Sequence, residues 1–248
     1  MRDSWSTKVL KAFGASAQRY NASARLQQGM AWQLAMRCRH ATTPSGLWVD
    51  LGSGTGRLAD ALELLHPGQS VLRLDGSSAM LNNQHRGAAT LLHDLNRPLP
   101  AWSSAPSLLC SNFVLHWLND PPGRLRHWYD QLTPGGWLAL AVPVAGSFGQ
   151  WHQAAERAGV PCTALPFPRV ESLLSAVPVA SVRWQRVQQF SRRGRHPLNL
   201  LRPMIRTGAD STPSSGLGPA AWRRLFQHWP QPDQPMLSWH VLTLMLQR

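Results

Sequence analysis

The stretch LWVDLGSGTGRLADALELL, residues 47–65, limits the fold of this chain more than any other. A short apolar run is followed by three glycines at alternate positions, Gly52, Gly54 and Gly56, and then by an amphipathic segment. This order predicts a strand that enters a helix through a tight turn, where glycine permits backbone angles and close approaches that other residues do not. Backbone N–H groups and the positive helix end at such a turn favour a polar or anionic ligand. The stretch therefore predicts a nucleotide-type loop, with a tight turn that binds no ligand as the alternative.

Strands and helices alternate along the rest of the chain. Strands are predicted at residues 47–52, 70–75, 89–95, 106–115 and 136–144, with helices at residues 57–66 and 123–132. This alternation predicts an α/β fold, in which a parallel sheet carries helices on its faces. Towards the C-terminus we expect helices near residues 147–159, 171–176 and 196–208, strands at residues 180–190 and 238–248, and a loop at residues 209–219.

The segment before the glycine loop has helical periodicity. One apolar face is formed by Val9, Phe13, Ala17 and Tyr20, and a second by Leu26, Met30, Leu34 and Cys38. Two amphipathic helices are predicted there, ended by the sequence ATTPSG. We expect one domain over residues 1–248: a helical prefix or lid (1–45), a cofactor-binding core (46–145), and substrate-side insertions with C-terminal strands (146–248).

Positive charge is the main bias of the composition. The 248 residues include 25 Lys+Arg and 12 Asp+Glu, a net charge of +13. Nucleic acid, an acidic protein surface or an anionic substrate would all be attracted by this field. No apolar run approaches membrane-spanning length, and the N-terminus lacks the order of a secretory signal, so we expect a cytoplasmic protein without a membrane partner. The three cysteines, Cys38, Cys110 and Cys162, are far apart and predict neither a disulfide framework nor a metal site.

The spacing of the loop favours one class of cofactor. Dinucleotide folds use G-x-G-x-x-G, whereas this chain has G-x-G-x-G with Asp50 two residues before the first glycine. The stretch resembles motif I of the class I S-adenosylmethionine-dependent methyltransferases. In that family the loop passes the amino acid moiety of S-adenosyl-L-methionine, and an acidic residue after the second strand, here Asp75, holds the ribose hydroxyls.

The resemblance extends over the next strands. LLHDLNRPLP places Asp94 at the adenine amino group and the Leu95 backbone at the ring, with Asn96 where many relatives have an acidic residue. CSNFVLHW resembles the segment that faces the sulfonium centre. The cofactor-binding residues that the resemblance implies are Asp50, Gly52, Ser53, Gly54, Gly56, Asp75, Gly76, Asp94, Leu95, Ser111 and Asn112.

A narrower resemblance comes from the flanking segments. KVLKAFGASAQRYNASARLQ, SNFVLHWLNDP, AGSFGQWHQA and NLLRPMIRTGA together resemble the malonyl-acyl carrier protein O-methyltransferases of biotin synthesis. This family implies a Rossmann-like fold with a mostly parallel seven-stranded sheet, helices on both faces, a helical prefix and a C-terminal antiparallel strand. It also implies methyl transfer to the free carboxylate of malonyl-acyl carrier protein. The chain departs from the pattern at Ser53, where relatives often have cysteine, and in VPCTALPFPRVESLL.

The implied chemistry needs few catalytic groups. A carboxylate is ionised at neutral pH and attacks a sulfonium methyl without a general base, so no catalytic residue beyond positioning is expected. The expected substrate-binding residues are Tyr20, His116, Trp117 and Arg202, with Arg206 or Arg19 as alternatives to Arg202. An acidic acyl carrier protein would be attracted by Arg192, Arg193 and Arg195, or by Arg223 and Arg224.

Other functions are compatible with the same cofactor motifs. One is another small-molecule methyltransferase, for example one that acts on a quinone precursor. A nucleic-acid methyltransferase would use the arginines, but the N-P-P-[YF] signature of base methylation is absent, and no nucleic-acid partner is expected. A non-catalytic cofactor-binding or nucleic-acid-binding protein is the third alternative. The sequence leaves open the oligomeric state and whether a coenzyme A thioester replaces the carrier.

Overall fold

The computed structural model describes residues 2–209 and 216–248. The strands are β1 (Trp48–Leu51), β2 (Val71–Asp75), β3 (Thr90–Leu92), β4 (Leu108–Asn112), β5 (Trp137–Pro143), β6 (Val182–Arg193) and β7 (Met236–Gln247). The helices are α1 (Arg2–Ser23), α2 (Arg25–Cys38), α3 (Arg57–Leu65), α4 (Ser78–Leu81), α5 (Pro121–Asp130), α6 (Gly149–Ala158), α7 (Val170–Leu174), α8 (Pro197–Thr207) and α9 (Pro219–Gln227). Short 3₁₀ turns lie at Leu115–Trp117 and Val179–Ser181.

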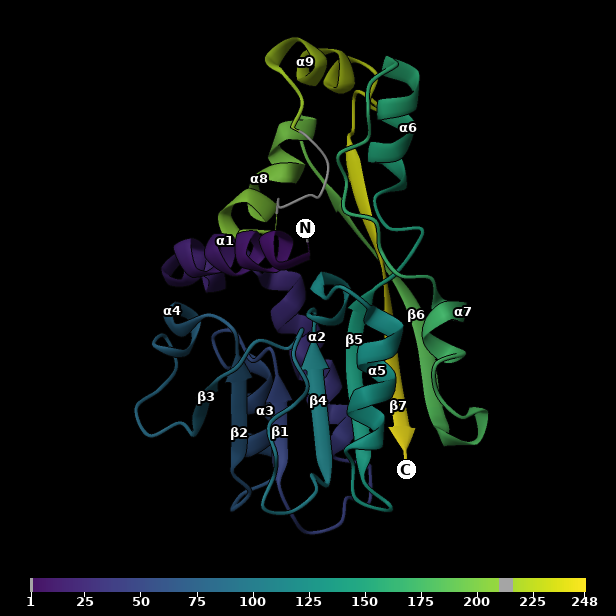
Figure 1. Ribbon diagram of the computed structural model, residues 1–248. Coiled ribbons are helices and arrows are strands. Elements are labelled where there is room, and N and C mark those ends of the chain that lie inside the picture. Colours follow the sequence, from purple (N-terminus) through teal and green to yellow (C-terminus); the bar gives the residue numbers. More distant parts are fainter. Residues whose placement is uncertain (1, 210–215) are drawn as a thin grey trace.

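The strands form one seven-stranded sheet in the order β3-β2-β1-β4-β5-β7-β6. The first five strands of this order are parallel to their neighbours, and β7 is antiparallel to both β5 and β6. The order reverses between β1 and β4, and ligands of doubly wound sheets bind in the crevice at the carboxyl ends of the strands at such a point. The topology confirms the predicted Rossmann-like fold, including its C-terminal antiparallel strand (Figure 1).

Helices cover both faces of the sheet. On one face α2 and α3 bury Leu34 and Leu62 against Trp48 and Cys110. On the other face α5 and α7 bury Trp128 and Leu173 in a core that includes Val49, Leu109 and Leu138. Because successive strand residues point to opposite faces and both faces are buried, the strands read as continuous apolar runs.

The paired strands β6 and β7 extend beyond the other strands of the sheet. The pairing of β5 with β7 ends at Pro143↔Val241, whereas β6 and β7 stay paired as far as Arg193↔Met236. The overhanging part carries α6, α8 and α9, and we call this unit the upper lobe (Figure 1). It has its own apolar core, which includes Trp151, Leu200 and Leu225. Helix α1 lies between the upper lobe and the carboxyl ends of the parallel strands.

The structure differs from the predicted elements in three places. Helices α4 and α9 were not predicted. The fourth strand ends at Asn112 rather than near residue 115, because Phe113 has a left-handed backbone with φ 60° and Leu115–Trp117 form a 3₁₀ turn. Residues 210–215 of the predicted loop at 209–219 lie outside the described residues. Within the described ranges, no helix has the length and apolarity needed to cross a membrane.

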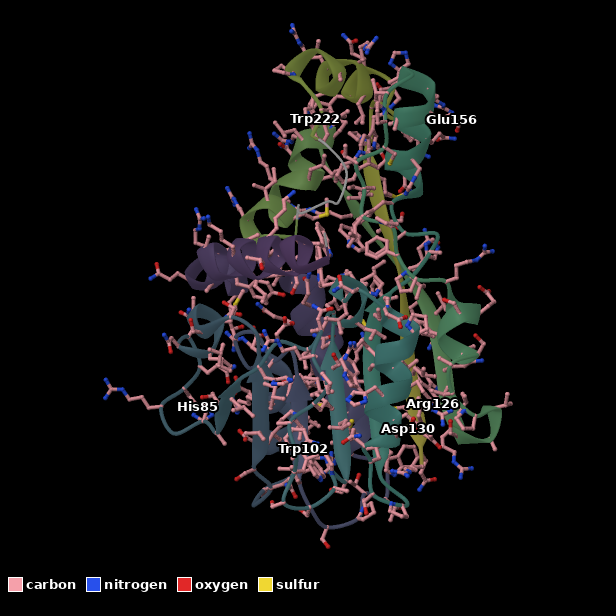
Figure 2. All side chains as sticks on the ribbon, in the orientation of Figure 1. His85, Trp102, Arg126, Asp130, Glu156 and Trp222 are labelled. Atoms are coloured by element: carbon pink, nitrogen blue, oxygen red, sulfur yellow. The ribbon has the colours of Figure 1, made fainter. Side chains whose placement is uncertain are left out.

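An arginine is completely buried next to the glycine loop. Arg73 of β2 has a side-chain exposure of 0% and forms ion pairs with Asp60 (2.8 Å) and Glu63 (2.5 Å) of α3. Both carboxylates keep some contact with water, with exposures of 41% and 28%. By contrast, the Arg126–Asp130 pair, 2.7 Å, lies on the outer side of α5 (Figure 2). Arg73 therefore fastens α3, and the loop that precedes it, to β2.

We predict that Arg73→Met lowers the free energy of unfolding by about 2 kcal/mol, because the two carboxylates lose a desolvated partner. The value is below the range for fully buried pairs, since water can rehydrate Asp60 and Glu63. The matched control Arg126→Met removes an exposed pair and should leave the free energy of unfolding nearly unchanged. Urea denaturation monitored by circular dichroism measures both, and equal effects of the two substitutions would contradict the prediction.

Candidate functional site

The loop between β1 and α3 approaches β2 through its backbone. The Gly52 and Ser53 N–H groups both donate to the Leu74 carbonyl at 2.8 Å. Gly52 has φ +75°, and a Cβ atom there would lie 2.3 Å from the Val114 side chain. Gly54 has φ +53°, and no atom lies within 4 Å of where its Cβ would be. The first glycine is therefore required by close packing, and Gly54 leaves open space in front of the loop.

Asp75, the last residue of β2, faces this loop. Its Oδ2 accepts a hydrogen bond from the Gly54 N–H and its Oδ1 from the Ser77 N–H, each at 2.8 Å. Burial raises the pKa of the Asp75 carboxyl, and the two N–H donors act in the opposite direction. A carboxylate has further lone pairs beyond those two bonds, so Asp75 can still accept from ligand hydroxyl groups.

A cavity lies in front of the loop, and we call it the loop cavity. The predicted cofactor residues that line it are Gly52, Gly54, Asp75, Gly76, Asp94, Leu95 and Asn112. The other predicted cofactor residues, Asp50, Ser53, Gly56 and Ser111, do not line the loop cavity but support the residues that do. The Asp50 carboxylate accepts from the Ala59 N–H, and burial raises its pKa to about 7. Ser53 Oγ accepts from Gln84, Ser111 Oγ donates to the Leu51 carbonyl, and Gly56 packs against Arg73.

Helix α1 forms the opposite wall of the loop cavity with Ser6, Val9, Leu10 and Phe13. These residues were not among the predicted site residues, although the helical face of Val9 and Phe13 was a usable signal. Helix α1 packs closely against the segment after β2 because that segment has a glycine there: a Cβ on Gly76 would lie 2.6 Å from the Leu10 side chain. Asn96 Nδ2 donates to Ser6 Oγ at 3.0 Å and joins the helix to the segment after β3.

A second and larger cavity of about 640 Å³ opens below the upper lobe, and we call it the lobe cavity. Four residues line both cavities: Phe13, Tyr20, Phe113 and Trp117. We call these four the aromatic wall. Phe13 and Trp117 meet edge to face with ring centroids 5.3 Å apart. The two cavities are therefore neighbours across one apolar wall, as a donor site and an acceptor site of a group transfer would be.

Two residues that line the lobe cavity, one of them part of the aromatic wall, have a left-handed backbone that non-glycine residues rarely adopt. Phe113 follows β4, Phe148 precedes α6, and each has φ 60°. Both line the lobe cavity. Hydrogen bonds hold the two positions, from the Phe113 N–H to the Ala141 carbonyl and from the Phe148 N–H to the Ser238 carbonyl. Such strain concentrates at binding sites, where it fixes a side chain in one direction.

The structure brings three of the four predicted substrate residues to the lobe cavity. Tyr20, His116 and Trp117 line it, and Arg202 does not. Arg202 is exposed because Leu201 and Met204 take the inward face of α8. The arginines that do line the cavity are Arg25, Arg192 and Arg206. Of these, Arg206 is the predicted alternative to Arg202, Arg192 is predicted to attract the carrier, and Arg25 has no predicted role.

Besides its arginines, the lobe cavity has buried polar groups that are neutral. Burial lowers the pKa of His116 to about 3, so its imidazole is uncharged at neutral pH. Its Nδ1 is buried without a hydrogen-bond partner among the described residues, as are Thr163 Oγ1 and Trp151 Nε1. Burial and the charge of Asp75 raise the pKa of Tyr20, so its hydroxyl keeps its proton. A buried polar atom without a partner is costly and points to a ligand contact.

Comparisons with known proteins connect this geometry to a family. Residues 49–138 match the family model described as a methyltransferase domain. Trans-aconitate 2-methyltransferase of Mycobacterium tuberculosis is 35% identical over 113 residues, which is 44% of this chain and 41% of the relative. The biotin biosynthesis bifunctional protein BioCD of Bordetella avium is 34% identical over 155 residues, 59% of this chain and 32% of the relative. The chain thus spans about two fifths or less of the length of these relatives.

Solved structures agree on the fold. The YcgJ protein of Bacillus subtilis has a TM-score of 0.61 at 10% identity, over 89% of this chain and 98% of that protein. Geranyl diphosphate C-methyltransferase of Streptomyces coelicolor, solved with S-adenosyl-L-homocysteine, has a TM-score of 0.52 at 14% identity, over 91% of this chain and 80% of that protein.

The residues of the loop cavity fit the cofactor of such domains. Asp75 offers a carboxylate for hydroxyl donors, and Leu95, Met80 and Leu10 offer apolar surface for an adenine ring. Asn112 lies at the end of β4, and its Oδ1 is buried without a partner among the described residues. An unpaired acceptor suits the ammonium group of the cofactor's amino acid moiety.

We predict that Asp75→Ala weakens binding of S-adenosylhomocysteine about 100-fold, because the hydroxyl acceptor is lost and the Gly54 N–H loses its partner. Isothermal calorimetry measures the affinity, and circular dichroism checks that the variant is folded. Asp130→Ala, on the outer side of α5, is the matched control and should bind normally. Unchanged affinity of a folded Asp75→Ala variant would remove the assignment of Asp75.

The topology, the glycine loop and the matched family model agree. Residues 49–138 therefore match a methyltransferase domain, the chain has the fold of solved methyltransferases, and the cofactor is S-adenosylmethionine.

Proposed function

We propose that this protein transfers the methyl group of S-adenosylmethionine to the free carboxylate of a malonyl thioester on acyl carrier protein. The observation that carries the proposal is the lobe cavity: arginine is its charged residue type, and no aspartate or glutamate lines it among the described residues. Such a cavity attracts an anion and repels a cation, and arginine binds a carboxylate through two parallel hydrogen bonds.

The chain supplies what methyl transfer to a carboxylate requires. When bound, S-adenosylmethionine supplies an electrophilic methyl group on a sulfonium, and a carboxylate oxygen accepts it without a proton transfer. The aromatic wall keeps water from the boundary between the two cavities, and this favours a reaction in which opposite charges cancel. The neutral imidazole of His116 offers a hydrogen bond without adding charge. No general base is needed, because the carboxylate is already ionised.

The shape of the lobe cavity favours an acyl substrate. Its volume of about 640 Å³ exceeds what a malonyl group alone occupies. Phe148, Phe167 and Trp239 line it, with centroid distances of 5.2 Å and 5.4 Å from the Phe148 ring to the other two. Aromatic surface of this kind suits an acyl or thioester-linked chain behind the carboxylate. The BioCD relative is named for biotin biosynthesis and agrees with this substrate class.

A second candidate substrate is a small polycarboxylate. Relatives from three genera are named trans-aconitate 2-methyltransferases, including one of Deinococcus radiodurans that is 39% identical over 95 residues, 38% of this chain and 37% of the relative. Three arginines line the lobe cavity, enough to meet three carboxylates. The aromatic lining favours the acyl substrate over this one, because it gives a polycarboxylate few hydrogen-bond donors.

The upper lobe also offers a surface for an acidic carrier. Arg193 is the last residue of β6, Arg195 lies between β6 and α8, and Arg223 and Arg224 lie on the exposed side of α9. None of the four forms an ion pair with a described residue. We propose that these arginines steer an acidic acyl carrier protein toward the lobe cavity.

We predict that the protein methylates malonyl-acyl carrier protein, producing a base-labile methyl ester. The measurement uses labelled S-adenosylmethionine with four acceptors in parallel: malonyl-carrier, malonyl-coenzyme A, trans-aconitate and acetyl-carrier, which lacks the free carboxylate. Malonyl thioesters should react and the acetyl thioester should not. Label transfer to trans-aconitate alone would establish the second candidate, and no transfer to any carboxylate would contradict the proposed function.

We predict that the affinity for the carrier falls about tenfold between 50 and 300 mM salt, because exposed charges are screened. The double variant Arg223→Ala/Arg224→Ala should bind the carrier more weakly and show a flatter salt dependence. Arg86→Ala/Arg97→Ala, next to β3 at the other edge of the sheet, is the control. Binding that is indifferent to salt and to both double variants would rule out steering by these arginines.

A further inference from the structure

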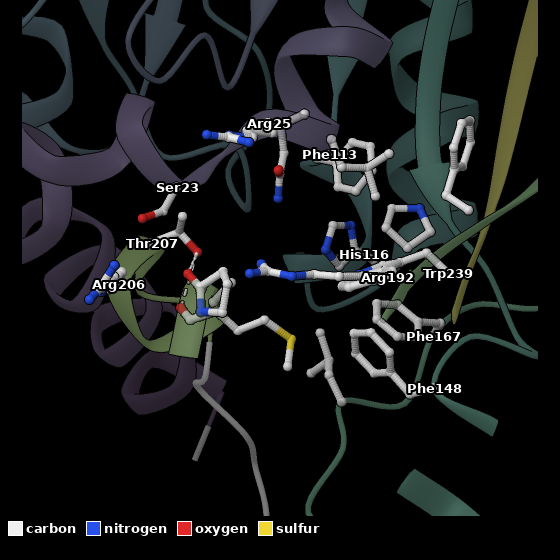
Figure 3. Close-up of a pocket in the computed structure, with 18 of the residues that line it drawn as sticks. Ser23, Arg25, Phe113, His116, Phe148, Phe167, Arg192, Arg206, Thr207 and Trp239 are labelled. Atoms are coloured by element: carbon white, nitrogen blue, oxygen red, sulfur yellow. Dashed lines mark hydrogen bonds between the residues drawn. The ribbon is translucent and has the colours of Figure 1, made fainter. Parts of the chain in front are cut away.

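Arg192 has an unusual position among the arginines of the upper lobe. It lies on β6 opposite Leu237 of β7, two residues after Phe190. Three consecutive residues, Phe190, Ser191 and Arg192, line the lobe cavity. Figure 3 shows the Arg192 side chain extending across the cavity and passing the His116 ring, whereas Arg25 and Arg206 lie at its margins.

The guanidinium of Arg192 has no protein anion to neutralise it. The arginine ion pairs of the described residues belong to Arg73, Arg126 and Arg169. The side chains around Arg192 in the cavity are largely aromatic, including Phe167 and Trp239 (Figure 3). Arg192 is exposed to solvent, and its guanidinium carries five N–H donors and no acceptor, so an anion that enters the cavity can replace water as its partner.

A second polar group, His116, lines the same cavity. His116 is 7% exposed, and its Nδ1 has no hydrogen-bond partner among the described residues. Its ring stands at the inner end of the cavity, with centroids 4.9 Å from Trp117 of the aromatic wall and 5.4 Å from Phe167. A carboxylate that reaches His116 would therefore lie at the side of the cavity that borders the loop cavity.

We propose that Arg192 is the residue that binds the reacting carboxylate of the substrate, with His116 as a neutral hydrogen-bond donor to it. This inference rests on the proposed function and names the group that selects for its substrate. It replaces two expectations from the sequence, in which Arg202 held the carboxylate and Arg192 only attracted the carrier. Arg202 is exposed on α8, outside the lobe cavity.

The test compares three single variants. Arg192→Gln removes the charge and should lower kcat/KM for the malonyl thioester about 100-fold, chiefly through KM. Arg192→Lys keeps the charge but loses the planar fork, so about a tenfold loss is expected. Arg186→Gln changes an exposed arginine of the same strand that does not line the cavity, and should stay within about twofold of the parent protein. Calorimetry with S-adenosylhomocysteine should give the same affinity for all three.

Selectivity provides a readout that a structural role of Arg192 would not move. The parent protein should bind malonyl-coenzyme A more tightly than acetyl-coenzyme A, and Arg192→Gln should abolish this preference while leaving acetyl-coenzyme A binding unchanged. The fluorescence of the tryptophans that line the cavity, Trp117, Trp151 and Trp239, reports binding without turnover.

The outcomes separate this inference from the proposed function. If the parent protein methylates malonyl thioesters and Arg192→Gln behaves like Arg186→Gln, the assignment of Arg192 is wrong and the proposed function stands. If the parent protein methylates no carboxylate but the malonyl preference depends on Arg192, the anion site stands and the proposed reaction is wrong. A preference that persists in Arg192→Gln overturns the assignment whatever the activity.

Discussion

The site depends on the contact between the glycine loop and the end of β2. Two loop N–H groups donate to the Leu74 carbonyl, and a third, from Gly54, donates to the Asp75 carboxylate. These bonds use main-chain donors, so they fix the position of the loop without filling the space in front of it. On the other side of β2, Arg73 holds α3 through Asp60 and Glu63. The loop is therefore fastened from both ends, and the cavity that it borders is formed before a ligand enters.

The N-terminal prefix completes both cavities. Helix α1 contributes Val9 and Leu10 to the loop cavity, and Phe13 and Tyr20 to both cavities. It is held against the core at Gly76 and against the upper lobe at Gly208, where a Cβ would lie 2.6 Å from the Ala12 carbonyl oxygen. One helix therefore borders both cavities. A change in its position would alter both cavities together.

Local patterns predicted the parts of the site that depend on local structure. The glycine loop and Asp75 follow directly from strands whose apolar runs are visible in the sequence, and the periodicity of Val9 and Phe13 gave the inner face of α1. What α1 covers was not predictable, because its partners at Gly76 and Gly208 are distant in sequence. Helix α9 did have a signal, Pro219 directly after Gly218, a common order at the start of a helix. The sequence held no signal for the direction of the Arg192 side chain. In QQFSRR, both faces of the overhanging strand carry polar residues, so no alternation of apolar and polar residues marks the side that faces the cavity.

The net charge of +13 has no single meaning in this structure. Arg73 is buried and paired, so its charge is neutralised by α3 and contributes to stability rather than to binding. Arg223 and Arg224 are solvated, and salt screens them. Arg192 differs from Arg73 because it has no carboxylate partner among the described residues, and from Arg223 and Arg224 because it lines the lobe cavity, although solvent reaches it as well. Composition shows an attraction for anions, but only the distance of each arginine from the nearest carboxylate shows which of them is available to hold one.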